Sequence, residues 1–303
     1  MRNERSPVTI DRREFLKTAL AATAAAGAAG VGAPRGAFAS EPRSGGLIDI
    51  NVNLGRWPLR RVRFDNTAGL AAMLRRQGVR RAWAASFDFL LHKDIAGTNA
   101  RLTEECRREG GGLLLPFGSV NPMLPDWEEE FRRCVEVHRM PGLRLYPNYH
   151  GYKLDNPDFA KLLGMAAAKG LLVELALIME DDRMMHPLLR VPVTDPAPLA
   201  GVVRQTPGLR LVIVNGLRTL RDKALVDVVN SGNVSVDIAM LDAVNGVTDL
   251  LAQLPAGRVL FGSYAPLFYF EAATLKVQEC PLTEAQVRAI RYESAQRLLP
   301  VST

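Results

Sequence analysis

Apolar runs of five to eight residues alternate with longer amphipathic stretches along most of the chain. Each apolar run has the length of a β-strand and is flanked by more polar residues, as strands commonly are. The runs predict eight strands, at residues 47–53, 80–86, 113–120, 142–147, 171–178, 209–215, 233–240 and 257–263.

The stretches between these runs carry apolar residues at three- and four-residue spacing, which is the period of an amphipathic helix. They predict helices at residues 67–77, 94–109, 126–138, 157–169, 196–205, 220–231, 243–254, 265–277 and 283–299. Asp126 and Thr283 stand where helix N-caps are expected, and Gln286, three residues after Thr283, completes a capping-box pattern.

Eight strands, each followed by a helix within about 260 residues, match the size and rhythm of a single (β/α)8 TIM barrel. A doubly wound open sheet is the alternative, but no Gly-x-Gly-x-x-Gly turn follows the first strand. The chain shows no internal repeat and no second domain. Residues 47–303 are therefore predicted to form one barrel domain.

The amino terminus follows a different pattern. Arg12-Arg13-Glu14-Phe15-Leu16-Lys17 precedes a mildly apolar Ala/Gly-rich run, which ends near Ala37-Phe38-Ala39. This order of basic, apolar and cleavage regions resembles a twin-arginine export signal; an amphipathic helix is the alternative. We expect residues 1–39 to be a signal peptide and 40–46 a linker. The export machinery is then a partner, and the mature protein is periplasmic or secreted.

The charge and composition of the chain argue against several classes of protein. The formal net charge is +6, and residues 1–39 supply +3 of it, because they hold six Lys/Arg against three acids. The mildly basic remainder has no basic face with interleaved aromatic residues, which argues against nucleic acid as a partner. No run in the mature chain approaches the roughly 18–20 apolar residues of a membrane span. Three widely spaced cysteines without a CxxC pair indicate isolated thiols.

Three segments carry motifs of a known kind. The fourth predicted strand leads into Gly142-Leu143-Arg144-Leu145-Tyr146-Pro147-Asn148-Tyr149-His150, which is similar to the fourth-strand signature of the amidohydrolase-related family of metal-dependent barrels. Phe261-Gly262-Ser263 is similar to its eighth-strand sequence Phe-Gly-Ser-Asp-x-Pro, and residues 289–299 to its final helix. The segments occur in order and at barrel spacing. The resemblance therefore implies the family's barrel, with the chemistry at the carboxyl ends of the strands.

The resemblance also implies a metal site, but the family's ligand positions hold other residues here. The two histidine positions of the first strand hold Asn51 and Asn53, and the histidine position of the sixth strand holds Asn215. Tyr264 stands at the eighth-strand position of the aspartate that is both ligand and general base. The fifth strand, where a histidine ligand is expected, has none.

Neutral amides are poor zinc ligands, and the four histidines of the chain are more than ten residues apart. We therefore expect no metal and no other cofactor. The alternative is a softer calcium or magnesium site, in which asparagine carbonyls join Asp237 or Glu174.

Polar residues at the carboxyl ends of the strands are the candidates for substrate binding. Asn51 and Asn53 alternate with apolar residues and should point into the barrel, where an unpaired amide costs about 1–3 kcal/mol. They should bond a substrate, a water or each other; a polar core without function is the alternative. Arg144 and Tyr146 share one face of the fourth strand, and Arg144 suits a substrate carboxylate unless it forms a salt bridge to a neighbouring strand. The other predicted substrate-binding residues are Arg56, Asn215 and Tyr264.

The candidates for catalysis are His150, Glu180, His186 and Asp237, with Asp181 as an alternative to Glu180. His150, beyond the fourth strand, can act as an acid or base near neutral pH; a surface-loop histidine is the alternative. Beyond the fifth strand, Glu180 or Asp181 can form a proton-transfer pair with His186, although charged loops are commonly only solvated. Asp237 stands mid-strand and needs a cationic or hydrogen-bonding partner if it is buried.

No Gly-x-Ser-x-Gly elbow and no Cys–His neighbourhood supports a nucleophilic triad. The sequence therefore favours an exported enzyme that acts on a small anionic molecule without the usual metal, by hydrolysis or by a lyase or decarboxylase-type proton transfer. The reaction class follows from the resemblance. The alternative is a catalytically inactive barrel used for ligand binding or partner assembly, and either form is compatible with a homodimer.

Overall fold

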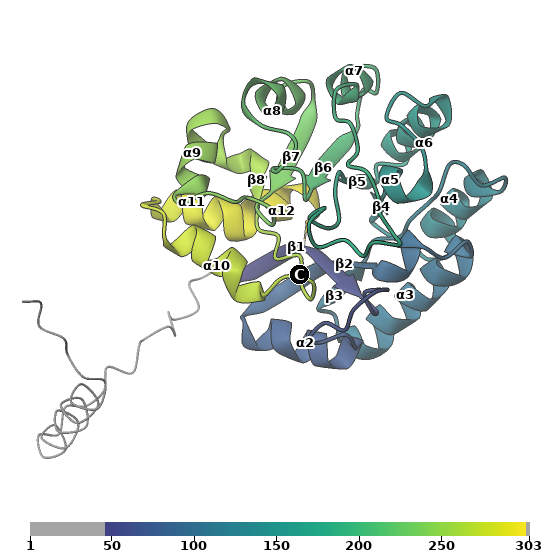
Figure 1. Ribbon diagram of the computed structural model, residues 1–303, viewed down its shortest axis with the longest axis horizontal. Helices are drawn as coiled ribbons and strands as arrows, with labels where there is room; N and C mark the ends of the chain where they lie inside the picture. Colours follow the sequence, from purple (N-terminus) through teal and green to yellow (C-terminus); the bar gives the residue numbers. More distant parts are fainter. Residues whose placement is uncertain (1–45, 301–303) are drawn as a thin grey trace, which may run out of the picture. The chain divides into compact units, whose positions relative to one another are not determined.

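Eight parallel strands occupy the centre of the computed structural model, which describes residues 46–300 (Figure 1). The predicted signal peptide, and the predicted linker except its last residue, lie outside the described residues. The strands are β1 (Leu47–Leu54), β2 (Val79–Ser86), β3 (Leu114–Pro116), β4 (Gly142–Leu145), β5 (Leu172–Ala176), β6 (Arg210–Val214), β7 (Asn233–Asp237) and β8 (Val259–Leu260).

Backbone contacts close these strands into a barrel. Strands β1 to β3 are hydrogen-bonded in order, and so are β4 to β8. A parallel bridge between Gly118 and Leu143 joins the end of β3 to β4, and a bridge between Val52 and Ala265 joins β1 to the segment after β8. The predicted single (β/α)8 barrel is confirmed, and the open-sheet alternative is excluded.

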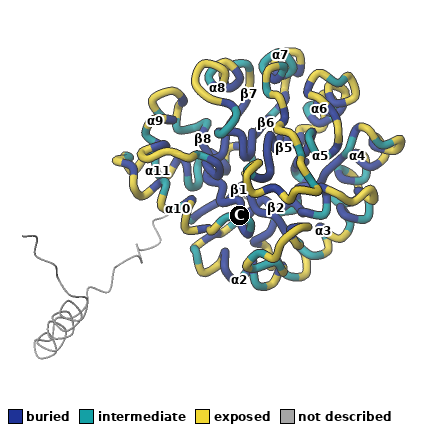
Figure 2. The backbone as a smooth tube through the Cα atoms, in the orientation of Figure 1, coloured by how far each residue is buried: buried dark blue, intermediate teal, exposed yellow. Residues whose placement is uncertain are grey.

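Helices cover the outside of the barrel, and each buries the face that packs on the strands while its outer face is exposed (Figure 2). None of the helices in the described range 46–300 is long and apolar enough to cross a membrane. The larger helices are α2 (Thr67–Arg76), α3 (Ile95–Gly110), α4 (Trp127–Glu136), α6 (Pro157–Ala168), α7 (Leu199–Arg204), α8 (Asp222–Val229), α9 (Gly246–Gln253) and α10 (Phe270–Gln278).

Short elements complete the fold: the helical turns η1 (Phe87–Leu90), α5 (Pro147–His150) and η2 (Ala256–Arg258), and the closing α11 (Glu284–Arg288), η3 (Ala289–Glu293) and α12 (Ser294–Leu298). The capping box predicted at the start of α11 is confirmed, because Thr283 and Gln286 exchange side-chain and backbone hydrogen bonds. Asp126 is the N-cap residue of α4, as predicted, but its side chain makes no capping hydrogen bond.

The three cysteines are free thiols, and all three are buried.

The largest departures from the predicted elements lie at β3, β8 and the last helix. Pro116 has no N–H to donate to the backbone hydrogen-bond ladder, and β3 ends at this residue, earlier than predicted. Strand β8 ends after two residues, and Tyr264 just beyond it has a left-handed φ of 59°. The final helix contains the π-turn η3, whose Ile290 carbonyl accepts a hydrogen bond of 3.0 Å from the Phe261 N–H. This bond ties the last helix to the end of β8.

Strand β1 contributes polar side chains to the barrel interior. Its residues are all buried, and apolar side chains alternate with Asp49, Asn51 and Asn53. Since successive side chains of a strand point to opposite faces, the three polar residues share the inner face. The barrel is therefore lined by polar groups where an ordinary TIM barrel is filled with branched apolar side chains.

Replacing Gly262 by alanine is expected to destabilise the barrel. A Cβ atom at this position would lie 2.5 Å from Asp237 Oδ2 and 3.0 Å from Asn51 Cβ. Because both side chains are fixed inside the barrel, we expect a loss of about 1–3 kcal/mol in the free energy of unfolding, measured in urea. Gly164→Ala is the control, since a Cβ there has nothing within 4 Å. Equal stability of the two variants would contradict the packing described here.

Candidate active site

A buried polar network fills the carboxyl half of the barrel interior. Each of its side chains is at most 1% exposed. They come from both halves of the barrel, so the network exists only when the barrel is closed. Its members are Asp49, Asn51 and Asn53 on β1, Arg144 on β4, Glu174 on β5, Asp237 on β7, Asn215 beyond β6 and Ser263 beyond β8.

Asn51 links three strands of the network. Its Nδ2 donates to Asn215 Oδ1 at 2.8 Å and to Asp237 Oδ2 at 2.7 Å. The backbone N–H of Asn215 donates to the other Asp237 oxygen at 2.9 Å. Both oxygens of Asp237 are therefore satisfied by neutral donors.

Asp49 is held by donors on its own strand and beyond β8. The Ser263 hydroxyl donates to Oδ2 at 2.5 Å, and the Ser263 N–H donates to Oδ1 at 2.9 Å. The Asn51 N–H adds a third bond of 3.1 Å. These bonds fasten β1 to the end of β8.

Arg144 is paired with Glu174, its register partner on β5, through a bond of 2.7 Å between Nε and Oε2. Its two terminal nitrogens donate to protein oxygens of β1 and β2. The prediction that Arg144 binds a substrate carboxylate is corrected, because its donors are already used inside the barrel. The salt bridge to a neighbouring strand, the predicted alternative, is formed.

Burial changes the acidity of the three carboxyl groups. It raises the pKa of Asp49 and of Glu174 to about 7 and that of Asp237 to about 6, while their hydrogen-bond donors and Arg144 oppose the rise. A carboxyl whose pKa lies near neutral pH can both accept and release a proton there. Such groups suit general acid–base chemistry.

The segment between β5 and α7, residues 177–198, covers the carboxyl end of the barrel; Figure 1 shows it crossing in front of the strands. The Tyr264 hydroxyl donates to the Met179 carbonyl at 2.6 Å, and Asn215 Nδ2 lies 3.9 Å from the Met179 sulfur. Glu180 forms an ion pair with Arg60 from the loop after β1. This cover segment therefore contacts loops on opposite sides of the barrel.

The predicted proton-transfer pair on the cover segment is not formed. His186 is exposed, and its Nδ1 accepts the Leu188 N–H at 3.2 Å. Glu180 is buried against Arg60, and Asp181 bonds arginine side chains. Each acid already has a cationic partner, so neither is free to serve the histidine.

Three further predicted residues lie outside the hydrogen-bonded network. The Nε2 of His150 is 2.9 Å from the Phe89 carbonyl, and burial lowers the pKa of this histidine. Arg56 is 72% exposed and lies 4.0 Å from Asp65. Tyr146 is buried beside Arg144, and burial raises the pKa of its hydroxyl.

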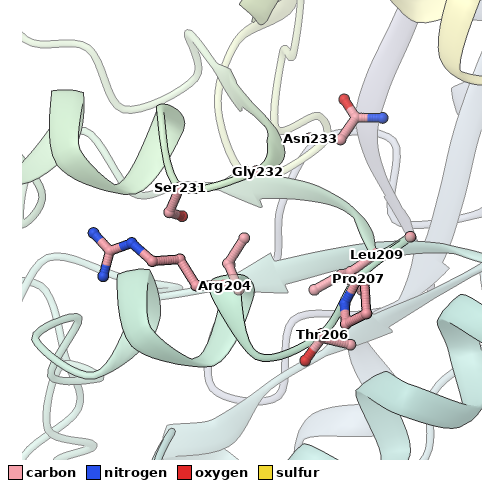
Figure 3. Close-up of a pocket in the computed structure, with 9 residues that line it drawn as sticks. Arg204, Thr206, Pro207, Leu209, Ser231, Gly232 and Asn233 are labelled. Atoms are coloured by element: carbon pink, nitrogen blue, oxygen red, sulfur yellow. The ribbon is translucent and has the colours of Figure 1, made fainter.

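Two hollows of about 210 and 380 Å³ lie at the opposite end of the barrel, near the amino ends of β6, β7 and β8. Figure 3 shows the smaller one, with Arg204 and Thr206 on one side and Ser231 on the other. Neither hollow is lined by a residue of the buried network. The network itself is closed to solvent, since each of its side chains is at most 1% exposed.

Glu174, Asp49, Ser263 and Met179 were not predicted as functional residues, although Glu174 was considered as an ion ligand. Glu174 and Asp49 could have been predicted from the sequence, because each is a charged residue inside an apolar strand, like Asp237. The contacts of Ser263 and Met179 depend on the loop geometry and have no such signal.

The residues present do not fit the family's metal ion. Within residues 46–300 no group of three or more His, Cys, Asp or Glu residues is placed to hold one. The amide oxygens of Asn51 and Asn53 accept bonds from the Arg144 guanidinium, whose positive charge would repel a metal ion. A calcium or magnesium site on Asp237 fits no better, since both its oxygens accept hydrogen bonds.

The family model for amidohydrolases matches residues 58–301. The chain belongs to the amidohydrolase family. This match covers the barrel from the loop after β1 to the last helix. The resemblance seen in the sequence is thereby confirmed, and no curated protein matches the chain.

Solved structures share the barrel of this amidohydrolase-family chain at low sequence identity. They include a 2,6-dihydroxybenzoate decarboxylase from Rhizobium, 14% identical, with a TM-score of 0.62 over 84% of this chain and 98% of that one. A 5-carboxyvanillate decarboxylase from Sphingomonas paucimobilis is 12% identical, with a TM-score of 0.63 over 84% and 99%. A dihydroxybenzoic acid decarboxylase from Polaromonas sp. JS666, with bound manganese, is 13% identical, with a TM-score of 0.60 over 84% and 96%.

Replacing Asp237 by asparagine is expected to flatten the pH dependence of stability. Because the pKa of folded Asp237 is raised from 3.8 to about 6, the folded protein binds this proton more tightly than the unfolded chain does. The carboxyl therefore favours folding below about pH 4, and this contribution is lost as the pH rises through about 6. Between about pH 4 and 7 the wild-type free energy of unfolding should fall by roughly 2 kcal/mol relative to Asp237→Asn.

Urea unfolding at a series of pH values measures this difference. Asp155→Asn is the control, because Asp155 is exposed. Parallel profiles for the wild type and Asp237→Asn would show that the carboxyl of Asp237 is not perturbed by burial.

Proposed function

We propose that this member of the amidohydrolase family is an enzyme that transfers a proton to or from a small anionic substrate without a metal ion. The observation that supports this most is the setting of Asp237. Its carboxyl group is fully buried at the carboxyl end of β7, is bonded to Asn51 and Asn215, and has a pKa of about 6. Of the catalytic residues predicted from the sequence, we therefore keep Asp237, and we no longer assign a catalytic role to His150 and His186.

The carboxyl of Asp237 suits either of two reactions. In a decarboxylation, its protonated form would deliver a proton to the carbon from which carbon dioxide leaves. In a hydrolysis, its ionised form would take a proton from the attacking water. The amide of Asn51, which already orients the carboxyl, would then orient the substrate as well. In either case the cover segment has to move before substrate reaches Asp237.

An anionic substrate agrees with the charges around the barrel mouth. Arg60 is 37% exposed and pairs with Glu180, and Arg218, beyond β6, is 24% exposed and pairs with Asp181 and Asp242. Arginine forks bind carboxylates in two-point contacts, so a substrate carboxylate could take the place of these acids when the cover segment moves. The structural neighbours are named for aromatic carboxylates, which are substrates of this kind.

The second candidate is an inactive barrel that binds a ligand or a partner. It is favoured by the enclosure of the network, since Asp237, Asn51 and Asn215 are at most 1% exposed and bond one another. In that case the polar network would serve only to hold the barrel together.

Turnover assays separate the two candidates. The full mature protein is incubated with 2,6-dihydroxybenzoate, 5-carboxyvanillate and a panel of cyclic amides and lactones, with and without EDTA. We expect turnover of at least one compound that EDTA does not reduce. Asp237→Asn should lower kcat by about 10²- to 10⁴-fold, because the proton donor or acceptor is removed.

Asp155→Asn, in an exposed loop, is the matched control and should keep full activity. Turnover that depends on added metal would refute the metal-free proposal. Binding of panel compounds with no turnover of any of them would favour the inactive barrel.

We also propose that the chain is exported through the twin-arginine machinery. The sequence around Arg12 and Arg13 supports this. Replacing both arginines by lysine should retain the protein in the cytoplasm, as measured by fractionation of cells that express the full chain. The same change at Arg2 and Arg5, outside the motif, should leave export intact. Equal export of both variants would refute the twin-arginine route.

A further inference from the structure

The guanidinium of Arg144 lies in an enclosure made of protein oxygen atoms. Its side chain is 1% exposed, and its donors reach oxygens on the adjacent strand β5 and, across the barrel interior, on β1 and β2. These oxygens are Glu174 Oε2 at 2.7 Å, Asn51 Oδ1 at 3.3 Å, Asn53 Oδ1 at 3.2 Å, and the carbonyls of Ile50 at 3.0 Å, Val52 at 3.1 Å and Trp83 at 3.3 Å.

Carboxylate, amide and carbonyl oxygens are the ligand set that hard divalent cations prefer. Here the same set surrounds an organic cation. The second oxygen of Glu174 accepts no hydrogen bond from the described residues, although Glu174 is fully buried. The enclosure thus contains a carboxyl oxygen without a hydrogen-bond partner in addition to the oxygens that Arg144 occupies.

The charges of the interior depend on Arg144. Burial acts to lower the pKa of its guanidinium, but Glu174 and further anionic neighbours outweigh this effect and raise it, so the group stays charged. Asp49 and Asp237 both act electrostatically on Glu174. Arg144 is therefore the cation paired with Glu174, and together with Lys276 it also acts on Asp237.

We propose that Arg144 is the resident cation of the barrel interior, and that its oxygen enclosure is a latent divalent-cation site which becomes available when the guanidinium is removed. The inference extends the metal-free aspect of the proposed function, but it does not require that the protein turn over any substrate.

Replacing Arg144 by alanine tests the proposal. The variant keeps the oxygens of Glu174, Asn51 and Asn53, but loses the charge that balances them and the volume of a large side chain. In EDTA its midpoint of thermal unfolding should fall by about 10 °C. Saturating MnCl2 or CaCl2 should raise that midpoint by about 5 °C or more, and native mass spectrometry should find one ion per chain.

Three controls define the site. Arg144→Lys keeps a cation in the enclosure and should bind no ion. Adding Glu174→Gln to Arg144→Ala should abolish ion binding. Arg210→Ala removes an arginine whose hydrogen bonds go to the carbonyls of Leu298 and Gly170, and its midpoint should not respond to either salt.

Several outcomes would overturn the proposal. They are an Arg144→Ala variant that binds no ion, one that stays unfolded when refolded with either salt, and a wild-type protein that itself carries a stoichiometric ion. None of these measurements uses turnover. A failure to find a substrate would therefore refute the proposed function and leave this inference standing.

Discussion

The ion pair between Arg144 and Glu174 is the interaction on which the rest of the barrel interior depends. Both side chains are buried, and they face each other from adjacent strands in direct register. Removing one partner of a buried pair typically costs about 3–5 kcal/mol, because the other charge stays uncompensated. The same guanidinium holds the side chains of Asn51 and Asn53, so the orientation of β1 depends on the pair as well.

That arrangement decides what the site can do. The charged groups of the barrel interior are the guanidinium of Arg144 and the carboxyl groups of Asp49, Glu174 and Asp237. Burial brings the pKa of Asp237 close to neutral pH, which gives the site a group able to exchange protons. Asp237 is fully buried, and the cover segment contacts its partner Asn215 and the nearby Tyr264 through Met179.

The barrel itself could be predicted from the sequence, because the alternation of apolar runs and amphipathic stretches is a local signal repeated eight times. The inward direction of Asn51 and Asn53 followed from the two-residue period of a strand. The partners of these residues could not be predicted. The pairing of Arg144 with Glu174, rather than with a substrate, depends on the register between β4 and β5.

The predicted contacts of loop residues were the least successful, because the sequence of a loop does not determine which strand ends the loop crosses. The acids Glu180 and Asp181 lay near His186 in sequence but bond arginines from other loops. Met179 appeared to be an ordinary apolar residue, and its position over Asn215 and Tyr264 is visible only in the folded chain.

A crystal structure of the wild-type protein, grown with MnCl2 and measured at the manganese absorption edge, would show whether an arginine or a metal ion occupies the barrel interior. We expect a guanidinium between Glu174 and the two asparagines of β1, with no anomalous peak inside the barrel. An anomalous peak bound by Asn51, Asn53 or Asp237, with Arg144 turned away, would contradict this expectation.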